Sequence, residues 1–112
     1  MQYIIIMQLV GIEWDEDKNE INKREHKGLS FEDAQYVFSD PERLERLDRS
    51  ESNTSEEERW QTIGKVGEIY FVVYTERGIN KRIITARPAD KSERRSYNGY
   101  YQIDGSGWSK TT

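Results

Sequence analysis

Basic side chains are concentrated between residues 77 and 95, where seven of them accompany only two acidic residues. The seven are Arg77, Lys81, Arg82, Arg87, Lys91, Arg94 and Arg95. A guanidinium group binds phosphate through paired hydrogen bonds and keeps its charge at physiological pH. A partner that carries phosphate groups is therefore the natural functional interpretation. Two simpler interpretations stay open from charge alone, a solvated surface and a surface that docks an acidic protein.

A second basic group, at residues 23–27, includes His26, the single histidine of the chain. Histidine titrates near neutral pH, so His26 could serve as a general acid or base, which would suit cleavage of a phosphodiester. The alternative is that the group ends a helix, where positive side chains complement the negative end of the helix dipole.

The third candidate is the tripeptide Glu58, Arg59 and Trp60. A carboxylate and a guanidinium at the entrance of a strand could supply a base and an anion clamp, and a tryptophan can stack on a nucleobase. Because Trp60 stands among strand residues, we interpret it as a core residue, and Glu58 and Arg59 are then exposed in the simpler alternative.

Several other chemistries are excluded by composition. The chain has no cysteine, which removes disulfides, thiolate chemistry and zinc ribbons. Asp15, Asp17 and Asn19 have the first spacings of a calcium loop, but Glu20 stands where that loop needs glycine and His26 replaces its closing glutamate. We therefore expect no metal site and no cofactor.

The whole chain has 112 residues, of which 34% are hydrophobic and 34% charged, with a net charge of −4. This predicts one small domain over residues 1–112. Net acidity argues against a general nucleic-acid coat protein. However, residues 13–60 carry a net charge of −8 and residues 61–112 a net charge of +4. The longest apolar run, residues 3–12, is too short for a membrane span of about 20 residues, so we expect a cytoplasmic protein.

The first half of the chain predicts a strand followed by helices. Residues 1–14 are rich in isoleucine, as in a buried strand. A polar helix is expected over residues 15–27, capped by Asp15 and ended by Gly28, with Ile21 as its one strong apolar residue. A second helix starts after Ser30 and ends before Pro41. Residues 42–48 fit either a helix or a strand, and residues 48–58 predict a solvated loop.

The second half predicts a β-meander and a final helix. Three strands are expected at residues 59–66, 68–76 and 80–87, with the middle one central because it is apolar on both faces. Residues 88–101 predict a basic helix, followed by a turn at residues 104–107. The predicted fold class is α+β, with a small antiparallel β-meander sheet packed against the N-terminal helices on one face and with a C-terminal helix.

The pattern resembles the BrnT toxins of bacterial type II toxin–antitoxin systems over about residues 9–98, with residues 99–112 as a tail outside it. The residues that carry the resemblance are Ile12-Glu13-Trp14-Asp15, Lys18-Asn19, His26-Lys27-Gly28, Ser30-Phe31, Ala34, Val37-Phe38, Asp40-Pro41, Glu58-Arg59-Trp60, Ile63-Gly64, Tyr74-Thr75-Glu76-Arg77, Arg82-Ile83-Ile84, Ala86-Arg87 and Glu93-Arg94-Arg95-Tyr97. The resemblance implies a RelE-like fold and a ribonuclease that stops growth by cleaving RNA. It also implies a BrnA-type antitoxin, which would bring the complex to operator DNA.

Cleavage of RNA without a metal needs a base, an acid and cations around the phosphate. Combined with the resemblance, this predicts the catalytic residues Lys23, His26, Glu58, Arg59, Arg77 and Arg87. Arg59, Arg77 and Arg87 would bind the phosphate, Lys23 or His26 would transfer protons, and Glu58 is an alternative base. The predicted RNA-binding residues are Lys27, Lys81, Arg82, Arg94 and Arg95. The competing hypothesis is a catalytically degenerate module that only docks a DNA-binding antitoxin.

Overall fold

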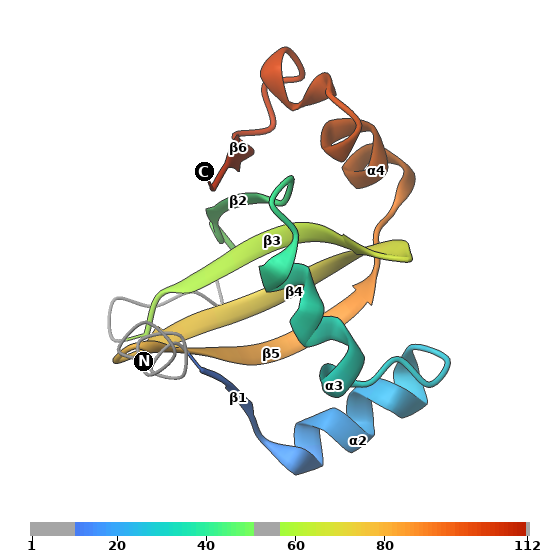
Figure 1. Cartoon of the computed structure of the whole chain (residues 1–112), viewed down its shortest axis with the longest axis vertical. Helices are drawn as coiled ribbons and strands as arrows, with labels where there is room; N and C mark the ends of the chain where they lie inside the picture. Colours follow the sequence, from blue (N-terminus) through green and yellow to red (C-terminus); the bar gives the residue numbers. More distant parts are fainter. Residues whose placement is uncertain (1–10, 51–56, 112) are drawn as a thin grey trace, which may run out of the picture.

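A computed structural model describes residues 11–50 and 57–111, which form a mixed sheet with helices packed around it (Figure 1). The elements, in chain order, are β1 (Ile12–Trp14), α2 (Glu16–Glu25), α3 (Phe31–Ala34), the 3₁₀ helix η1 (Gln35–Ser39), β2 (Leu44–Leu47), β3 (Arg59–Val66), β4 (Glu68–Arg77), β5 (Asn80–Pro88), α4 (Lys91–Tyr97), the 3₁₀ helix η2 (Tyr100–Gln102) and β6 (Ser109–Lys110). The α+β class is confirmed, and the ambiguous segment 42–48 contains a strand.

The strand order is β1-β5-β4-β3-β2-β6. As predicted, β3, β4 and β5 form an antiparallel meander with β4 between the other two. The sheet is nevertheless mixed, because β1 pairs with β5 in parallel, with Ile12 opposite Lys81. Between β1 and β5 the chain passes through α2, α3, η1 and the other strands, so that β5 returns beside β1 and runs in the same direction. The expectation of a purely antiparallel sheet is thus wrong at this edge, and residues 1–10 of the predicted first strand lie outside the described residues.

One face of the sheet, called here the helix face, is covered by α3 and η1 (Figure 1). The core on this side joins the helices to β4 and β5 through Leu29, Phe31, Ala34, Val37, Val72, Ile83 and Ala86. Gly64 of β3 permits the close approach of η1, because a Cβ atom there would lie 2.7 Å from the Cβ of Val37. The second helix expected between Ser30 and Pro41 is thus present as α3 followed by η1.

Helix α2 lies along the edge of β5 and is held by polar side chains instead of apolar ones (Figure 1). Asn22 accepts a hydrogen bond from the backbone N–H of Ala86 (3.1 Å) and donates one to the carbonyl of Leu29 (3.0 Å). Asn19 accepts from the N–H of Phe31 (2.8 Å). Both asparagines are buried, whereas Ile21 is 42% exposed. Two amides that satisfy backbone groups therefore hold this polar helix, and its one strong apolar residue is left exposed.

The opposite face has its own apolar cluster, formed with the C-terminal part of the chain. Leu44, Ile63 and Phe71 lie side by side on β2, β3 and β4, and Trp108 packs edge-on against Phe71. The prediction of helices on one face only is thus incomplete. The final helix is shorter than expected, because Asp90 and Glu93 form a capping box and the helix ends at Asn98.

After the final helix the chain turns at residues 104–107, as predicted, and adds β6 to the outer edge of β2. In the described part of the chain, no helix is long and apolar enough to cross a membrane. Residues 51–56 of the predicted loop lie outside the described residues.

Candidate nucleic-acid interface

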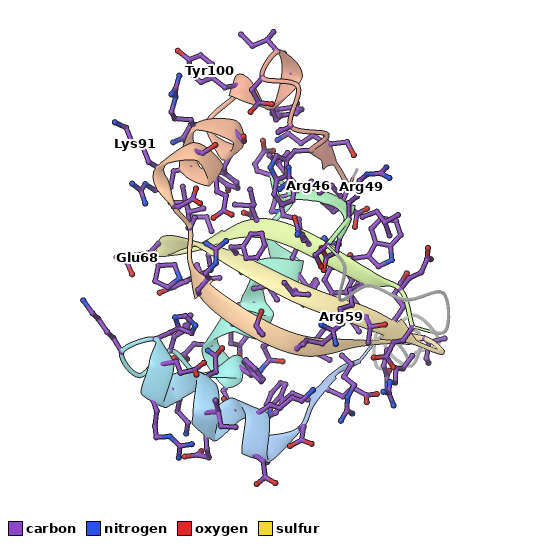
Figure 2. The ribbon with its side chains drawn as sticks, turned by 180° about the vertical axis from the view of Figure 1, so that it is seen from behind. Arg46, Arg49, Arg59, Glu68, Lys91 and Tyr100 are labelled. Atoms are coloured by element: carbon purple, nitrogen blue, oxygen red, sulfur yellow. The ribbon has the colours of Figure 1, made fainter. Side chains whose placement is uncertain are left out.

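Strand pairing, with a register shift in β5 opposite Val73 and Tyr74 of β4, places five arginines on the sheet face opposite α3, called here the arginine face. They are Arg46 on β2, Arg59 on β3, Arg77 on β4, and Arg82 and Arg87 on β5. Side chains along a strand alternate between faces, so residues in register with one another share a face. Figure 2 views the molecule from this side and shows Arg46 and Arg59. The meander thus gathers cations that are far apart in sequence.

The register defines one polar row that crosses four strands. Arg59 is opposite Thr75, Thr75 is opposite Arg82, and Arg82 is opposite Glu13 of β1. Neighbouring strands are about 4.8 Å apart, so the Cα atoms of Arg59 and Arg82 are separated by about 10 Å. Two arginine side chains at that spacing can reach one phosphate group. Arg59 and Arg82 are both half-buried.

Arg82 is held by the carboxylate of Glu13, with 2.7 Å between Nη1 and Oε2. Asn80 also donates a hydrogen bond to Glu13, at 3.1 Å. These hydrogen bonds, from Asn80 first and Arg82 second, lower the pKa of Glu13 below its ordinary value. Glu13 therefore stays ionised at neutral pH, and its ion pair fixes the orientation of the Arg82 side chain.

Arg77, the last residue of β4 before the turn to β5, pairs with Glu57 at 2.8 Å, and the two side chains are 49% and 42% exposed. An ion pair this exposed contributes little to stability, typically about 0–1 kcal/mol, because water screens both charges. Exchange of Glu57 for another anion would therefore cost little free energy. Arg77 is the cation of the arginine face that is most readily available to a ligand.

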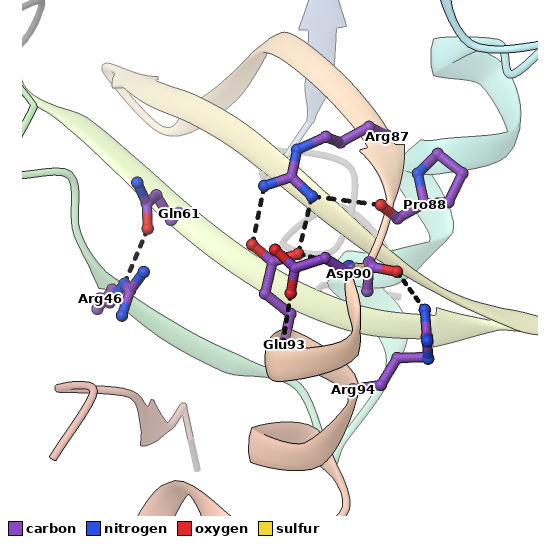
Figure 3. A network of polar contacts seen from close by, with 8 residues as sticks. Arg46, Gln61, Arg87, Pro88, Asp90, Glu93 and Arg94 are labelled. Carbon is purple, nitrogen blue, oxygen red and sulfur yellow. Dashed lines mark hydrogen bonds and ion pairs between the residues drawn. The ribbon is translucent and has the colours of Figure 1, made fainter. Parts of the chain in front are cut away.

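Arg87 is fixed more firmly (Figure 3). Its two terminal nitrogens donate to the two oxygens of Glu93, each at 2.8 Å, and its guanidinium lies 4.0 Å from the centre of the Phe71 ring. The hydrogen bonds that Arg87 donates to Glu93 raise the pKa of Arg87, although burial acts in the opposite direction. Glu93 is 8% exposed and also caps α4. Arg87 thus ties α4 to the sheet and has fewer donors left for a ligand.

A polar chain at β2 and β3 was missed from the sequence. Arg46 donates from Nε to Gln61 (2.8 Å), and Gln61 donates to the buried carboxylate of Asp48 (3.2 Å). Arg46 lies directly opposite Gln61 in the register. If residues 44–47 had been recognised as a strand, the alternation of its side chains would have placed Arg46 on the same face as Leu44.

The predicted proton-transfer residues of α2 lie beside the sheet instead of on the arginine face. Lys23 pairs with Glu20 at 2.7 Å, and this hydrogen bond raises the pKa of Lys23. His26 is the half-buried C-cap of α2, and Lys27 has a left-handed backbone with φ of 54°. No described hydrogen bond or ion pair joins these three side chains to the arginines.

The two neighbours of Arg59 have different outcomes: Glu58 agrees with its simpler interpretation, and Trp60 does not. Glu58 is exposed, and its backbone carbonyl accepts a hydrogen bond from Thr75 at 2.7 Å. Trp60 is half-buried and belongs to neither apolar cluster, so the core interpretation of this residue is wrong. Trp60 instead lines two surface hollows, one of them with Tyr74 and Lys81.

The predicted RNA-binding residues are divided between several surfaces. Arg82 is on the arginine face, whereas Lys81 points to the helix face, 5.3 Å from the centre of the Tyr74 ring. Arg94 donates to the carbonyl of Ala89 (2.6 Å), and Arg95 lies 5.2 Å from the centre of the Tyr100 ring. Among the described residues, no group of three or more acidic, histidine or cysteine side chains could hold a metal ion.

Residues 14–93 match the sequence profile of the family described as ribonuclease toxin, BrnT, of type II toxin-antitoxin systems. The chain belongs to the BrnT family. No curated protein matches it. The fold is similar to that of the crystal structure of the Brucella abortus ribonuclease toxin BrnT, with a TM-score of 0.52 and 23% sequence identity. That alignment covers 73% of this chain and 99% of the Brucella protein.

The BrnT match contains all five arginines of the arginine face. It begins at Trp14, one residue after Glu13, and ends at Glu93. Arg94, Arg95, η2 and β6 come after it. Membership confirms the family resemblance that the sequence suggested, and it makes this chain a member of a family of ribonuclease toxins that act with antitoxins.

Proposed function

We propose that this BrnT-family protein is an endoribonuclease that cleaves RNA on its arginine face without a metal ion, and thereby inhibits translation and growth in the bacterial cytoplasm. The observation that carries the proposal is the gathering of five arginines from four strands on one sheet face. Such a surface binds the phosphates of a single strand, and it stabilises the extra negative charge that develops on phosphorus during cleavage.

The reaction uses the RNA's own 2′-oxygen as nucleophile. This oxygen bonds to the adjacent phosphorus, the bond from phosphorus to the 5′-oxygen breaks, and the products are a 2′,3′-cyclic phosphate and a 5′-hydroxyl. A base takes the 2′-hydroxyl proton, and an acid returns a proton to the leaving oxygen. Arg59, Arg77 and Arg82 would bind the phosphate, and Arg87 would contribute its charge from its fixed position.

Among the proton-transfer candidates, Lys23 is the least suitable base, because Glu20 raises its pKa and keeps it protonated. His26 and Glu58 are the two remaining candidates. The dependence of kcat on pH separates their roles. The variant that removes the general base loses the acid limb of the profile, whereas the variant that removes the acid loses the alkaline limb.

The decisive experiment incubates the purified protein with RNA in EDTA and identifies the product ends by mass spectrometry. We expect cyclic phosphate ends, and a loss of about 10²–10³-fold in kcat for Arg59→Ala, the size found when a charge-stabilising donor is removed. Arg77→Ala should weaken growth inhibition. Arg24→Ala, an exposed arginine on α2, is the matched control. Intact RNA, together with an Arg77→Ala variant as toxic as the unaltered protein, would sink the proposal.

The same assays judge the alternative of a binding module without catalysis. That alternative wins if expression without a partner is harmless while the protein still co-purifies with an antitoxin and the pair binds DNA. We further propose that the fold is RelE-like, and that a BrnA-type antitoxin covers the arginine face and recruits operator DNA through its own domain. The ion pairs that Arg77, Arg82 and Arg87 already make with carboxylates support binding of the antitoxin at this face, because an acidic antitoxin segment would use the same contacts.

A further inference from the structure

A cleft of about 700 Å³ lies next to the arginine face, at the end of β2 and β3. Its volume is within the range of about 300–1,000 Å³ that is usual for ligand sites. The described lining comes from three segments, which are residues 45–50, Trp60 with Gln61, and the tail residues Ser106, Gly107 and Ser109. Figure 2 shows Arg46 and Arg49 close together at this end of the sheet.

Arg46 differs from the other paired cations of the arginine face. Arg77, Arg82 and Arg87 each contact a carboxylate, whereas Arg46 makes no ion pair with a described residue. Its contacts are neutral: Gln61, the carbonyl of Ser106 at 2.5 Å, and the ring of Trp108, whose centre is 4.0 Å away. Burial lowers the pKa of Arg46, but an arginine stays charged at physiological pH. Arg46 thus brings to the cleft a positive charge that is not held in a described ion pair, although the lining also includes the carboxylates of Glu45 and Asp48.

Arg49 adds a second cation to the cleft. Its side chain is exposed, and it is three residues from Arg46 on the segment that leaves β2. Trp60 provides an aromatic surface in the same lining. A pair of guanidinium groups beside an aromatic ring is the combination that binds one nucleotide of a single strand, with the phosphate on the cations and the base on the ring.

The C-terminal tail builds one wall of the cleft. Asp104 accepts hydrogen bonds from the backbone N–H of Ser106 (2.9 Å) and from the hydroxyl of Ser96 (2.5 Å), which fixes the turn against α4. This turn places the Ser106 carbonyl where it accepts a hydrogen bond from Arg46. This tail follows the segment that matches the BrnT family, which ends at residue 93. This wall of the cleft therefore comes from residues outside the matched segment, whereas residues 45–50, Trp60 and Gln61 lie within it.

We propose that the cleft is a nucleotide subsite, which holds a residue of the RNA next to the scissile phosphate and binds its phosphate through Arg46 and Arg49. The proposal rests on the proposed ribonuclease function and deepens it. The subsite extends the row of arginines towards β2, so the RNA would run across the sheet from Arg82 to Arg46. The tail would then influence which RNA is cut and how tightly it is held.

The test uses two RNA probes, an oligonucleotide with 2′-O-methyl groups that cannot be cleaved and an unmodified one that can. Arg49→Ala is the main variant because its exposed side chain can be removed without disturbing the fold, and Arg24→Ala is the control. We expect Arg49→Ala to weaken binding of the methylated probe about tenfold, the loss of one charge-assisted hydrogen bond. The slope of log affinity against log salt should fall by about 0.7, as for one lost contact to a single strand.

The cleavage arm separates this proposal from the proposed function. In that arm Arg49→Ala should raise KM for the long RNA and leave kcat unchanged, while a dinucleotide substrate should be cut equally by both proteins. A weakened affinity for the methylated probe without any cleavage would support the subsite and refute the ribonuclease. Equal affinities and equal KM values would overturn the subsite and leave the ribonuclease standing. Loss of antitoxin binding alone, with RNA binding unchanged, would also overturn it.

Discussion

The carboxylate of Asp40 shows how one residue connects three elements of the fold. It accepts hydrogen bonds from the Tyr97 hydroxyl (2.6 Å), from the backbone N–H of Lys65 (2.8 Å) and from that of Glu42 (2.9 Å). Burial acts to raise the pKa of Asp40, but these hydrogen bonds outweigh it and lower the pKa. In the sequence Asp40 is only one member of the Asp40-Pro41 pair of the family pattern, because its hydrogen-bond partners Lys65 and Tyr97 are distant in the chain.

Asp40 should therefore make stability depend on pH in the acid range. Its pKa is lowered by folding, so its contribution is fully present above the unfolded value of about 3.9 and is lost as the pH falls through the folded value. We expect Asp40→Asn to lower the free energy of unfolding at pH 7 and to flatten the decline below pH 4. Urea unfolding at a series of pH values measures both. Parallel curves for the two proteins would contradict this role.

At the scale of elements, the strands of the meander were predictable and the attachment of α2 was not. The strand boundaries follow from local apolar patterns and from glycines at the turns, which depend on neighbouring residues only. The burial of Asn19 and Asn22 depends on backbone groups of Leu29, Phe31 and Ala86 that need a partner. Hydrophobicity alone cannot detect that need: it ranks Ile21 as the most apolar residue of the helix, although Ile21 is exposed and the two asparagines are buried.

A pair of variants on α2 tests this attachment. Asn22→Ala removes the hydrogen-bond partner of two backbone groups, and an unsatisfied buried group costs about 1–3 kcal/mol. Ile21→Ala, one residue earlier on the exposed side, should change the free energy of unfolding by only about 0.5 kcal/mol. Thermal or urea unfolding of both variants provides the comparison. A larger loss for Ile21→Ala would show that α2 is held by its apolar residue after all.

The candidate site was also only partly predictable. Arg59, Arg77, Arg82 and Arg87 could be found, because they lie on predicted strands. Alternation alone would separate Arg82 from Arg87, which are five residues apart and share a face only because the register shifts between Val73 and Tyr74. Arg46 could not be found, since the four residues of β2 fit a helix equally well until their pairing with β3 is known. The paired carboxylates Glu13, Glu57 and Glu93 belong to other elements, and only the fold reveals which arginine each one holds.

At the scale of the whole molecule, the charge of the chain is distributed so that a net acidic protein has a basic sheet face. The acidic surplus lies in residues 13–60, which include α2 and α3, and the meander with α4 has a positive balance. A polyanion therefore meets attraction on one side and repulsion on the other, which orients its approach. The moderate total affinity that results suits an enzyme that must also release its product.

This distribution predicts a salt-dependent complex with the proposed antitoxin. If an acidic antitoxin segment covers Arg77 and Arg82, the association rate should fall strongly as the salt concentration rises, because screening weakens steering of opposite charges. Arg77→Ala should reduce that dependence, and Arg24→Ala should not. Stopped-flow association at several salt concentrations measures the effect. A complex in which Arg77 stays open to solvent would contradict inhibition by covering of the arginine face.

The hydrogen bond from Arg46 to the Ser106 carbonyl also has a consequence for the timing of synthesis. Its two ends are 60 residues apart, so at about 5–20 residues per second the ribosome needs about 3–12 s to supply the second after the first. Glu93 likewise emerges after Arg87. A nascent chain would therefore carry Arg46 and Arg87 before it has the groups that orient them, whereas Glu13 and Glu57 are made before Arg82 and Arg77. This interval would let a neighbouring antitoxin bind before the toxin matures.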